Sequence, residues 1–240
     1  MDVTLISMPR LALAFIPVAI VVVLMWSWHQ NYGRALYAVA RMLLQLILIG
    51  YVLIFIFETD SALVISAVLA VMLVAASWIA LNTIDLPKGP LFLASLVAVL
   101  IGGGSTLALI TQGVLSLDPW YRPSFMIPLA GMIFSASMTN ISLALERLRA
   151  EMNNGLEFCD ARDIAFRASM IPVVNSFFAV GLISLPGMMT GQILSGVSPL
   201  IAARYQIMVM CMIFGAAGLS TVCFLIMMRR HRYFQAPKTA

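Results

Sequence analysis

The sequence predicts an all-α, polytopic membrane protein. Its 240 residues are 62% hydrophobic and only 10% charged, with a mean hydropathy of +1.02, whereas a soluble domain is about a quarter charged. Apolar runs of about 20 residues recur without two-residue alternation, which favours helices over strands. Because lipid offers no partners to backbone amides, only helices or closed barrels can span a bilayer. We expect one transmembrane domain over residues 1–240.

Seven apolar runs are each long enough to cross a bilayer. We expect spans at Pro9–Trp28, Ala35–Phe57, Ala62–Leu81, Leu91–Gln112, Phe125–Leu145, Ile171–Leu194 and Ile201–Met228. The first run resembles a secretory signal, but it is long and no small-x-small cleavage site precedes Trp26 and Trp28. We therefore interpret it as a permanent helix.

The basic residues predict how these spans are oriented. With seven spans, ten of the 14 lysines and arginines fall on one side, three fall on the other, and Arg41 lies inside a span. Cytoplasmic loops retain an excess of positive charge. We therefore expect the N-terminus outside, and the C-terminus and residues 146–170 in the cytoplasm. A basic Arg229–Arg232 tail that meets anionic lipid accounts for the net charge of +4 without a nucleic-acid partner.

Residues 146–170 form a charge-dense segment in an otherwise apolar chain. The run Asp160-Ala-Arg-Asp163 can cap a helix in which Ile164, Ala165, Ala168 and Ile171 share one face, while Arg162, Asp163 and Arg167 share another. Asp163 and Arg167 are spaced for an ion pair. This pattern predicts a short amphipathic helix at the membrane surface. It either only connects two spans or acts as a lever whose charged side docks on a cytoplasmic protein and whose apolar side leads into the predicted span 171–194. Its continuation through Pro172 into that span favours the lever.

Polar side chains inside the spans are candidates for a transport path, because they are costly in hydrocarbon. Arg41 and Gln45 are four residues apart and share one helix face. They either line a path or, as the alternative, Arg41 extends to the inner interface while Gln45 bonds a neighbouring backbone. The other candidates for path lining, for which interhelical hydrogen bonds are the alternative, are Asn175, Ser176, Gln192 and Gln206.

A helix break is expected at Pro186 and Gly187. Proline removes an amide and clashes with the preceding turn, and glycine adds backbone freedom. Both residues lie about halfway along the predicted span 171–194. Transport proteins place substrate sites at such interruptions, because unwound backbone supplies polar groups inside the membrane. A kink that serves only packing is the alternative.

No enzyme motif is present in the sequence. There is no G-x-x-x-x-G-K-[ST] phosphate loop, no H-E-x-x-H and no G-x-S-x-G. The glycine run at 102–104 lies mid-span, where close helix packing is its expected role. Three cysteines and two histidines define no local metal centre, so metal ligands stay unassigned. We expect no cofactor on this chain, and energy for transport must come from a partner or an ion gradient.

Four blocks resemble the signature blocks of the FetB-type permease family, in the same order: residues 41–53 (RMLLQLILIGYVL), 127–133 (IPLAGMI), 181–194 (GLISLPGMMTGQIL) and 205–209 (YQIMV). The resemblance implies the membrane half of an ABC transporter that pairs with a separate ATP-binding subunit. In bacteria such permeases are implicated in iron export and in resistance to metal or oxidative stress. Plant relatives are tied to aluminium tolerance, and one complex is linked to UDP-glucose.

The resemblance also assigns a role to the charged segment. It implies that the ATPase docks on residues of that segment, for which our candidates are Arg147, Arg149, Asp160, Arg162, Asp163 and Arg167. We expect ATP on the partner subunit, a homodimer of the permease, and a multi-pass location in a bacterial inner membrane.

Two other function classes remain as alternatives. An ion-coupled secondary transporter would need an intramembrane carboxylate relay, and no acidic residue lies well inside a predicted span. A non-transporting membrane scaffold would need neither Arg41 nor the break at Pro186.

Overall fold

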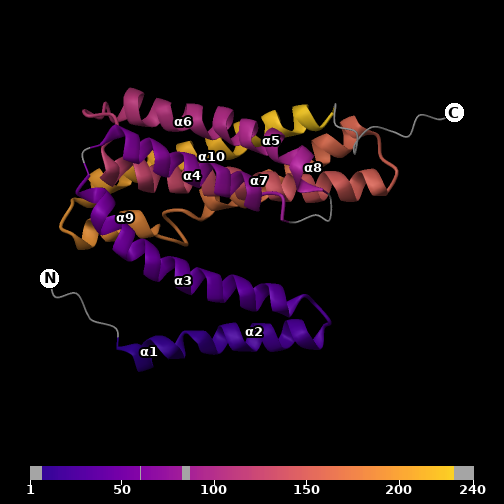
Figure 1. Cartoon of the computed structure of the whole chain (residues 1–240), viewed down its shortest axis with the longest axis horizontal. Helices are drawn as coiled ribbons and strands as arrows, with labels where there is room; N and C mark the ends of the chain where they lie inside the picture. The colour runs from indigo at the N-terminus through magenta and orange to yellow at the C-terminus, as the bar shows by residue number, and fades with distance from the viewer. Residues whose placement is uncertain (1–6, 60, 83–86, 230–240) are drawn as a thin grey trace. The chain divides into compact units, whose positions relative to one another are not determined.

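The chain is almost entirely helical wherever its structure is described. The computed structural model describes residues 7–59, 61–82 and 87–229, and within these ranges it contains helices and turns but no β-strand (Figure 1). Six of the described helical segments are long and apolar enough to cross a bilayer. The prediction of an all-α, polytopic membrane protein is therefore confirmed.

Two compact units make up the chain, Met1–Thr59 and Asp60–Ala240. The first unit contains α1 (Met8–Leu13), α2 (Phe15–Ser27) and α3 (Tyr32–Phe57). α1 and α2 together make an apolar segment of 20 residues, and α3 makes one of 26. In the turn before α3, the Asn31 side chain accepts a hydrogen bond of 3.2 Å from the backbone N–H of Arg34 and so caps the helix. Most of the described apolar side chains of this unit are exposed, as expected of helices that lipid solvates.

The second unit is a helical bundle. In chain order it contains α4 (Ala62–Ile79), α5 (Lys88–Ala98), η1 (Val99–Gly104), α6 (Ser105–Ala108), η2 (Leu109–Val114), α7 (Pro123–Asn153), α8 (Phe158–Ala179), α9 (Gly187–Leu194) and α10 (Pro199–Met228). α5 to η2 follow one another without a break, so residues 89–114 form one span that holds two π-helical segments. α7 packs against α4, α8 and α10, and α10 also packs against α5, η1, α8 and α9.

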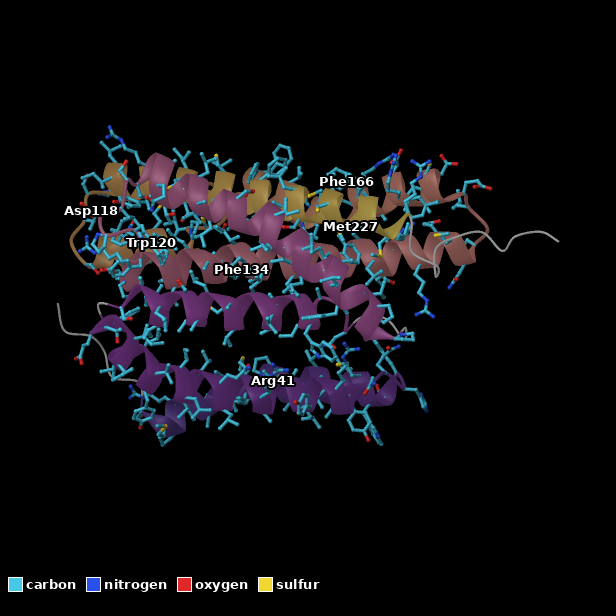
Figure 2. All side chains as sticks on the ribbon, turned by 45° about the horizontal axis from the view of Figure 1, so that its top comes forward. Arg41, Asp118, Trp120, Phe134, Phe166 and Met227 are labelled. Atoms are coloured by element: carbon cyan, nitrogen blue, oxygen red, sulfur yellow. The ribbon has the colours of Figure 1, made fainter. Side chains whose placement is uncertain are left out.

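Contacts between distant residues fix the helix directions in this bundle. Asn140 Nδ2 on α7 lies 3.5 Å from the sulfur of Met170 on α8, and the rings of Phe177 on α8 and Phe214 on α10 lie 5.3 Å apart. α8 therefore runs back along α7, and α10 returns along α8. Figure 2 shows Asp118 and Trp120 at one end of the unit and Phe166 and Met227 towards the other. Which end faces the cytoplasm stays a prediction.

The glycine run at 102–104 brings η1 into backbone contact with α10. A Cβ on Gly102 would overlap the backbone nitrogen of Ser220 and would lie 2.6 Å from its Cα. A Cβ on Gly103 would lie 3.1 Å from Cγ2 of Ile133 on α7. Beside this contact, the Ser220 hydroxyl donates a hydrogen bond of 2.9 Å to Ser137 Oγ, and Ser137 donates one of 3.3 Å to the carbonyl of Ala216. The glycines thus serve close helix packing, as predicted.

The predicted sixth span, residues 171–194, is broken as expected, but the break is longer than predicted and begins before Pro186. α8 begins at Phe158 and continues through Pro172 to Ala179, residues 180–186 form a turn, and α9 begins at Gly187. Pro172 removes only one intrahelical hydrogen bond, which α8 tolerates. The chain leaves the helix at Val180, whose ψ is 132°, and at Gly181, whose φ is +84°. The six segments that the structure does contain are Met8–Ser27, Tyr32–Phe57, Ala62–Ile79, Gly89–Val114, Pro123–Asn153 and Pro199–Met228.

Substitution of Gly102 by alanine should destabilise the bundle. The added Cβ meets backbone atoms of α10 that cannot rotate away, and overpacking of this kind costs about 1–3 kcal/mol. The thermal unfolding temperature of the detergent-solubilised protein measures the effect. Gly104→Ala is the matched control, because its Cβ would meet only Cδ1 of Leu100 at an ordinary 3.5 Å. Equal unfolding temperatures for both variants would contradict this account of the packing.

Candidate coupling hairpin and membrane pocket

The charged segment 146–170 is a helical hairpin that prolongs two long helices. It consists of the end of α7, a loop at residues 154–157 and the first half of α8. α7 has 31 residues, which corresponds to about 46 Å of helix against about 30 Å for the hydrocarbon core. One end of α7 must therefore project beyond the core, and the charged end is the one that water would solvate. Gly155, with a φ of +90°, turns the chain between the two helices.

Small side chains attach α8 to its neighbours. The buried residues of α8 within the charged segment are Ala161, Ala165, Ser169 and Met170. The first three recur every four residues and so form one stripe of small side chains. Small side chains allow two helix backbones to approach closely. The predicted apolar face of Ile164, Ala165, Ala168 and Ile171 is therefore wrong in register, since only Ala165 of those four is buried.

The hairpin contains no separate amphipathic helix at the membrane surface. The charged residues and the apolar residues that follow them belong to the same helix, α8, which continues through Pro172 as the lever interpretation expects and is longer than the predicted short helix. α8 begins after Glu157, whose side chain makes no capping hydrogen bond. Asp160 therefore does not cap the helix. It lies in the first turn, where the helix dipole favours a negative charge.

Two ion pairs organise the charges of the hairpin. Arg147 Nη2 lies 2.5 Å from Oε1 of Glu151, which is one turn later on α7, and the Glu151 side chain is only 9% exposed. Arg162 Nε donates a hydrogen bond of 2.8 Å to Asp163 Oδ1, and this bond raises the pKa of Arg162 above its usual value. Asp163 thus pairs with Arg162 and not, as predicted, with Arg167.

The remaining predicted docking residues are accessible. Arg149 is half-buried, and Asp160 and Arg167 are exposed. None of the three forms an ion pair within the described part of the chain. The hairpin therefore presents charged groups of both signs to the medium around it.

The turn at residues 180–186 separates α8 from α9, and residues 181–185 in it are all exposed. The N–H of Gly181 bonds to the carbonyl of Ser184, and the N–H groups of Ile183 and Ser184 both bond to the carbonyl of Ala179. Pro186, with no N–H of its own, then precedes the first residue of α9. The break therefore begins six residues before Pro186 and is broader than a kink.

A pocket of about 450 Å³ lies beside this break. The end of α8, the turn, α9 and α10 surround it, and its lining includes Phe177, Val180, Gly181, Met189, Gln206 and Met210. Gln206 is 6% exposed, and its Oε1 has no hydrogen-bond partner among the described residues. Gln206 lies about two turns into α10, so the pocket is not at the end of that helix.

None of the other predicted path residues of the second unit lines this pocket. Ser176 is half-buried and donates a hydrogen bond of 2.6 Å to the carbonyl of Val173 in its own helix, and Asn175 is exposed on α8. Gln192 on α9 has a buried Oε1 without a partner in the described residues, but it is not part of the pocket lining. Arg41, labelled on α3 in Figure 2, and Gln45 are both exposed and belong to the first unit.

Several features of the site have no clear sequence signal. The lining residues Phe177, Met189 and Met210 are ordinary apolar residues in the sequence, and only the break at Pro186 pointed to their neighbourhood. A second cavity, of about 370 Å³, lies at the end of the bundle where Figure 2 labels Trp120, and η2 contributes Thr111 and Gln112 to it. Within the described ranges, no three His, Cys, Asp or Glu side chains gather as a metal site would require.

Comparison with known proteins places this architecture in a family. The model of the family described as "Uncharacterised protein family (UPF0014)" matches residues 8–234. The chain belongs to the UPF0014 family. No solved structure matches the chain.

Three relatives cover most of its length. A UPF0014 membrane protein of Synechocystis is 37% identical over 221 residues, which are 85% of this chain and 85% of the relative. The protein named "Probable iron export permease protein FetB" of Escherichia coli is 34% identical over 209 residues, 79% of this chain and 78% of the relative. "Protein ALUMINUM SENSITIVE 3" of Arabidopsis thaliana is 35% identical over 233 residues, 90% of this chain and 84% of the relative. The resemblance to FetB-type permeases is therefore confirmed.

Substitution of Arg147 by alanine should destabilise the hairpin. It leaves the carboxylate of Glu151 buried without its partner, and for a pair with one exposed member we expect a loss of about 1–2 kcal/mol. Arg149→Ala is the control, because Arg149 has no ion-pair partner in the described chain. Thermal unfolding of the purified protein measures both. If Arg149→Ala lowers the unfolding temperature as much as Arg147→Ala does, the Arg147–Glu151 ion pair does not stabilise the hairpin.

Proposed function

We propose that this UPF0014 chain is the membrane-spanning subunit of an ABC transporter that exports iron or another metal species. ATP is hydrolysed on a separate cytoplasmic ATPase, and the chain itself binds no nucleotide. The permease works as a homodimer in a bacterial inner membrane, with residues 146–170 on the cytoplasmic side. The printed name of the Escherichia coli relative, a probable iron export permease, supports the choice of cargo and direction.

The observation that carries this proposal is the continuity of α8. One uninterrupted helix of 22 residues, about 33 Å long, joins the charged hairpin to the turn at residues 180–186. Arg162 and Asp163 lie near its start, and Phe177 lines the pocket close to its end. A displacement imposed on the hairpin is transmitted along a rigid rod to the pocket, which a flexible connection could not do.

A two-state scheme follows from this geometry. ATP binding draws the two ATPase subunits together, and the hairpins docked on them move with the ATPases. ATP can shift the permease only if the ATP-bound assembly has a higher affinity for one arrangement of α8 than for the other. α8 can change its angle at the turn of residues 180–186 without moving α9. In the described chain, the backbone hydrogen bonds made by residues 180–185 join only residues 176–184 to one another.

Purification of the chain from native membranes should retain an ATPase subunit. We expect a protein with a phosphate-loop motif in near-stoichiometric amounts, identified by mass spectrometry. The double variant Arg162→Glu, Arg167→Glu should lose most of it, because the charge of the docking surface is reversed. Arg122→Glu, a reversal in the turn that precedes α7, is the control and should retain it. The proposal fails if the wild type retains no such protein, or if the chain alone moves iron in vesicles that lack an ATPase.

Pro186→Ala should abolish coupled transport while membrane insertion stays normal. Alanine supplies the missing N–H and removes the ring clash, so α9 can extend into the turn and stiffen it. ATP-dependent iron movement in inverted vesicles and the amount of membrane-inserted protein measure the two effects. ATP-dependent iron uptake into inverted vesicles at the wild-type rate by this variant would show that the break does not take part in transport.

A further inference from the structure

The turn at residues 180–186 begins within the hydrocarbon core of the bilayer. Arg167 is the last charged residue of α8, and it is exposed. A charged side chain is costly inside the core, so Arg167 marks its edge. Val180 follows 13 residues later, which is about 20 Å along a helix, whereas the core is about 30 Å thick. The chain therefore leaves the helix before it has crossed the core.

The described chain leaves this turn uncovered. Residues 181–185 are all exposed, and no N–H in the described chain bonds to the carbonyls of Phe177 and Phe178. Irregular backbone inside the core is tolerated only where protein covers it or where it lines a water-filled cavity. The pocket beside the turn has an almost wholly apolar lining, which does not suit water. Another protein surface must therefore cover the turn.

A projection and a hollow lie side by side on this surface. Leu182 and Ile183 in the turn are 90% and 84% exposed, and the preceding residues Val180 and Gly181 line the pocket of about 450 Å³. Helices in lipid associate through close packing, and an unfilled hollow forfeits those contacts. A regular helix laid over the turn would offer Leu182 and Ile183 no hollow. A second copy of the same surface offers one to each projection, because a two-fold axis pairs such a surface with itself.

The exposed surface around the turn is large enough for such a pairing. The large side chains in the turn, on α9 and at the start of α10 that are 60% or more exposed are Leu182, Ile183, Leu185, Leu194, Leu200 and Ile207. Ile207 itself lines the pocket, and Leu200 lies two turns before it on the same face of α10. Burial of each side chain removes roughly 100 Å², so these residues bury roughly 600 Å² per copy before the pocket wall is added. A standard interface buries about 800 Å² per partner.

α9 carries two open glycines beside the pocket. A Cβ on Gly187 or Gly191 would meet nothing within 4 Å, so neither glycine is needed for packing within the described chain. They are four residues apart and share one face of α9. Small residues at this spacing let the backbones of two membrane helices approach closely. The open glycines therefore favour a helix of another copy against α9.

We propose that a second copy of this chain covers the turn. Leu182 and Ile183 of each copy enter the pocket between α8, α9 and α10 of the other, and Gly187 and Gly191 let the two α9 helices lie close together. The pocket is complete only when the partner fills it. This interface deepens the homodimer of the proposed function and rests on it, but it requires neither a docked ATPase nor a metal cargo.

A disulfide between two differently tagged copies tests the contact. Cys211 lines the pocket and is exposed, so a cysteine that replaces Leu182 should reach Cys211 of the other copy. One copy carries Leu182→Cys with Cys159→Ser, Cys211→Ala and Cys223→Ala, and the other keeps Cys211 as its only cysteine. The two are co-expressed and oxidised in membranes with copper phenanthroline, and the product that carries both tags is measured. A disulfide within one copy cannot give this product.

Leu109→Cys is the matched control, because Leu109 on η2 is 65% exposed but does not line the pocket. Leu182→Cys should give at least about tenfold more of the mixed-tag product, since a disulfide requires the two Cα atoms to lie within about 7 Å of each other. Native mass spectrometry measures the oligomeric state in parallel. A dimer that gives no mixed-tag product overturns this interface while the homodimer stands, and a monomeric permease overturns both.

Gly191→Leu tests the part that α9 plays. A Cβ at this position meets nothing within 4 Å in one copy, so the fold stays intact, but the new side chain obstructs a partner helix. The yield of the mixed-tag product should fall at least about fivefold. Gly50→Leu on α3, where a Cβ also meets nothing within 4 Å, should leave the yield unchanged. An unchanged yield with Gly191→Leu would contradict the proposal, and so would equal losses in both variants.

Discussion

The contact of Gly102 with Ser220 is the constraint on which the bundle depends. Lipid chains are as apolar as leucine, so helices in a bilayer gain little from hiding apolar surface from one another. They associate through close packing and hydrogen bonds instead. Gly102 lets the backbone of η1 meet that of α10, and Ser137 and Ser220 bond α7 to α10 beside this point. Because α7 and α10 also hold α4, α8 and α9, this contact positions most of the second unit.

The same principle explains how α8 reaches both ends of the unit. A stripe of small residues keeps it close to its neighbours at the charged end, and the Phe177 and Phe214 rings meet near the other end. At its charged end, α8 is thus held close to its neighbours without large interlocking side chains. Such a helix can shift as one body, because small side chains do not interlock with the side chains of neighbouring helices. The hairpin and the pocket are therefore linked by geometry as well as by chain continuity.

The apolar runs and the break were predictable because their causes are local. A run of about 20 apolar residues has few alternatives to a membrane helix, and proline removes its N–H in any context. The continuation of α8 through Pro172 was expected, but its ends at Phe158 and Ala179 were not predictable in this way, because hydropathy falls at its charged residues while its backbone hydrogen bonds continue. The buried stripe of Ala161, Ala165 and Ser169 on α8 was missed because alanine and serine are less hydrophobic than isoleucine and so mark a buried helix face less clearly. Glu151 is buried although charged, since Arg147 compensates it one turn earlier. The pocket arises only when α8, α9 and α10 meet.

The break also has a chemical consequence that a continuous helix would not have. An interrupted helix frees both donors and acceptors, but the turn at residues 180–186 recovers mainly the donors. The N–H group of Gly181 bonds to the carbonyl of Ser184, and those of Leu182 and Ile183 bond to that of Ala179, whereas no N–H in the described chain bonds to the carbonyls of Phe177 and Phe178. Proline at position 186 reinforces this imbalance, because it contributes a carbonyl and no N–H. A helix broken by proline in lipid is therefore biased towards accepting hydrogen bonds.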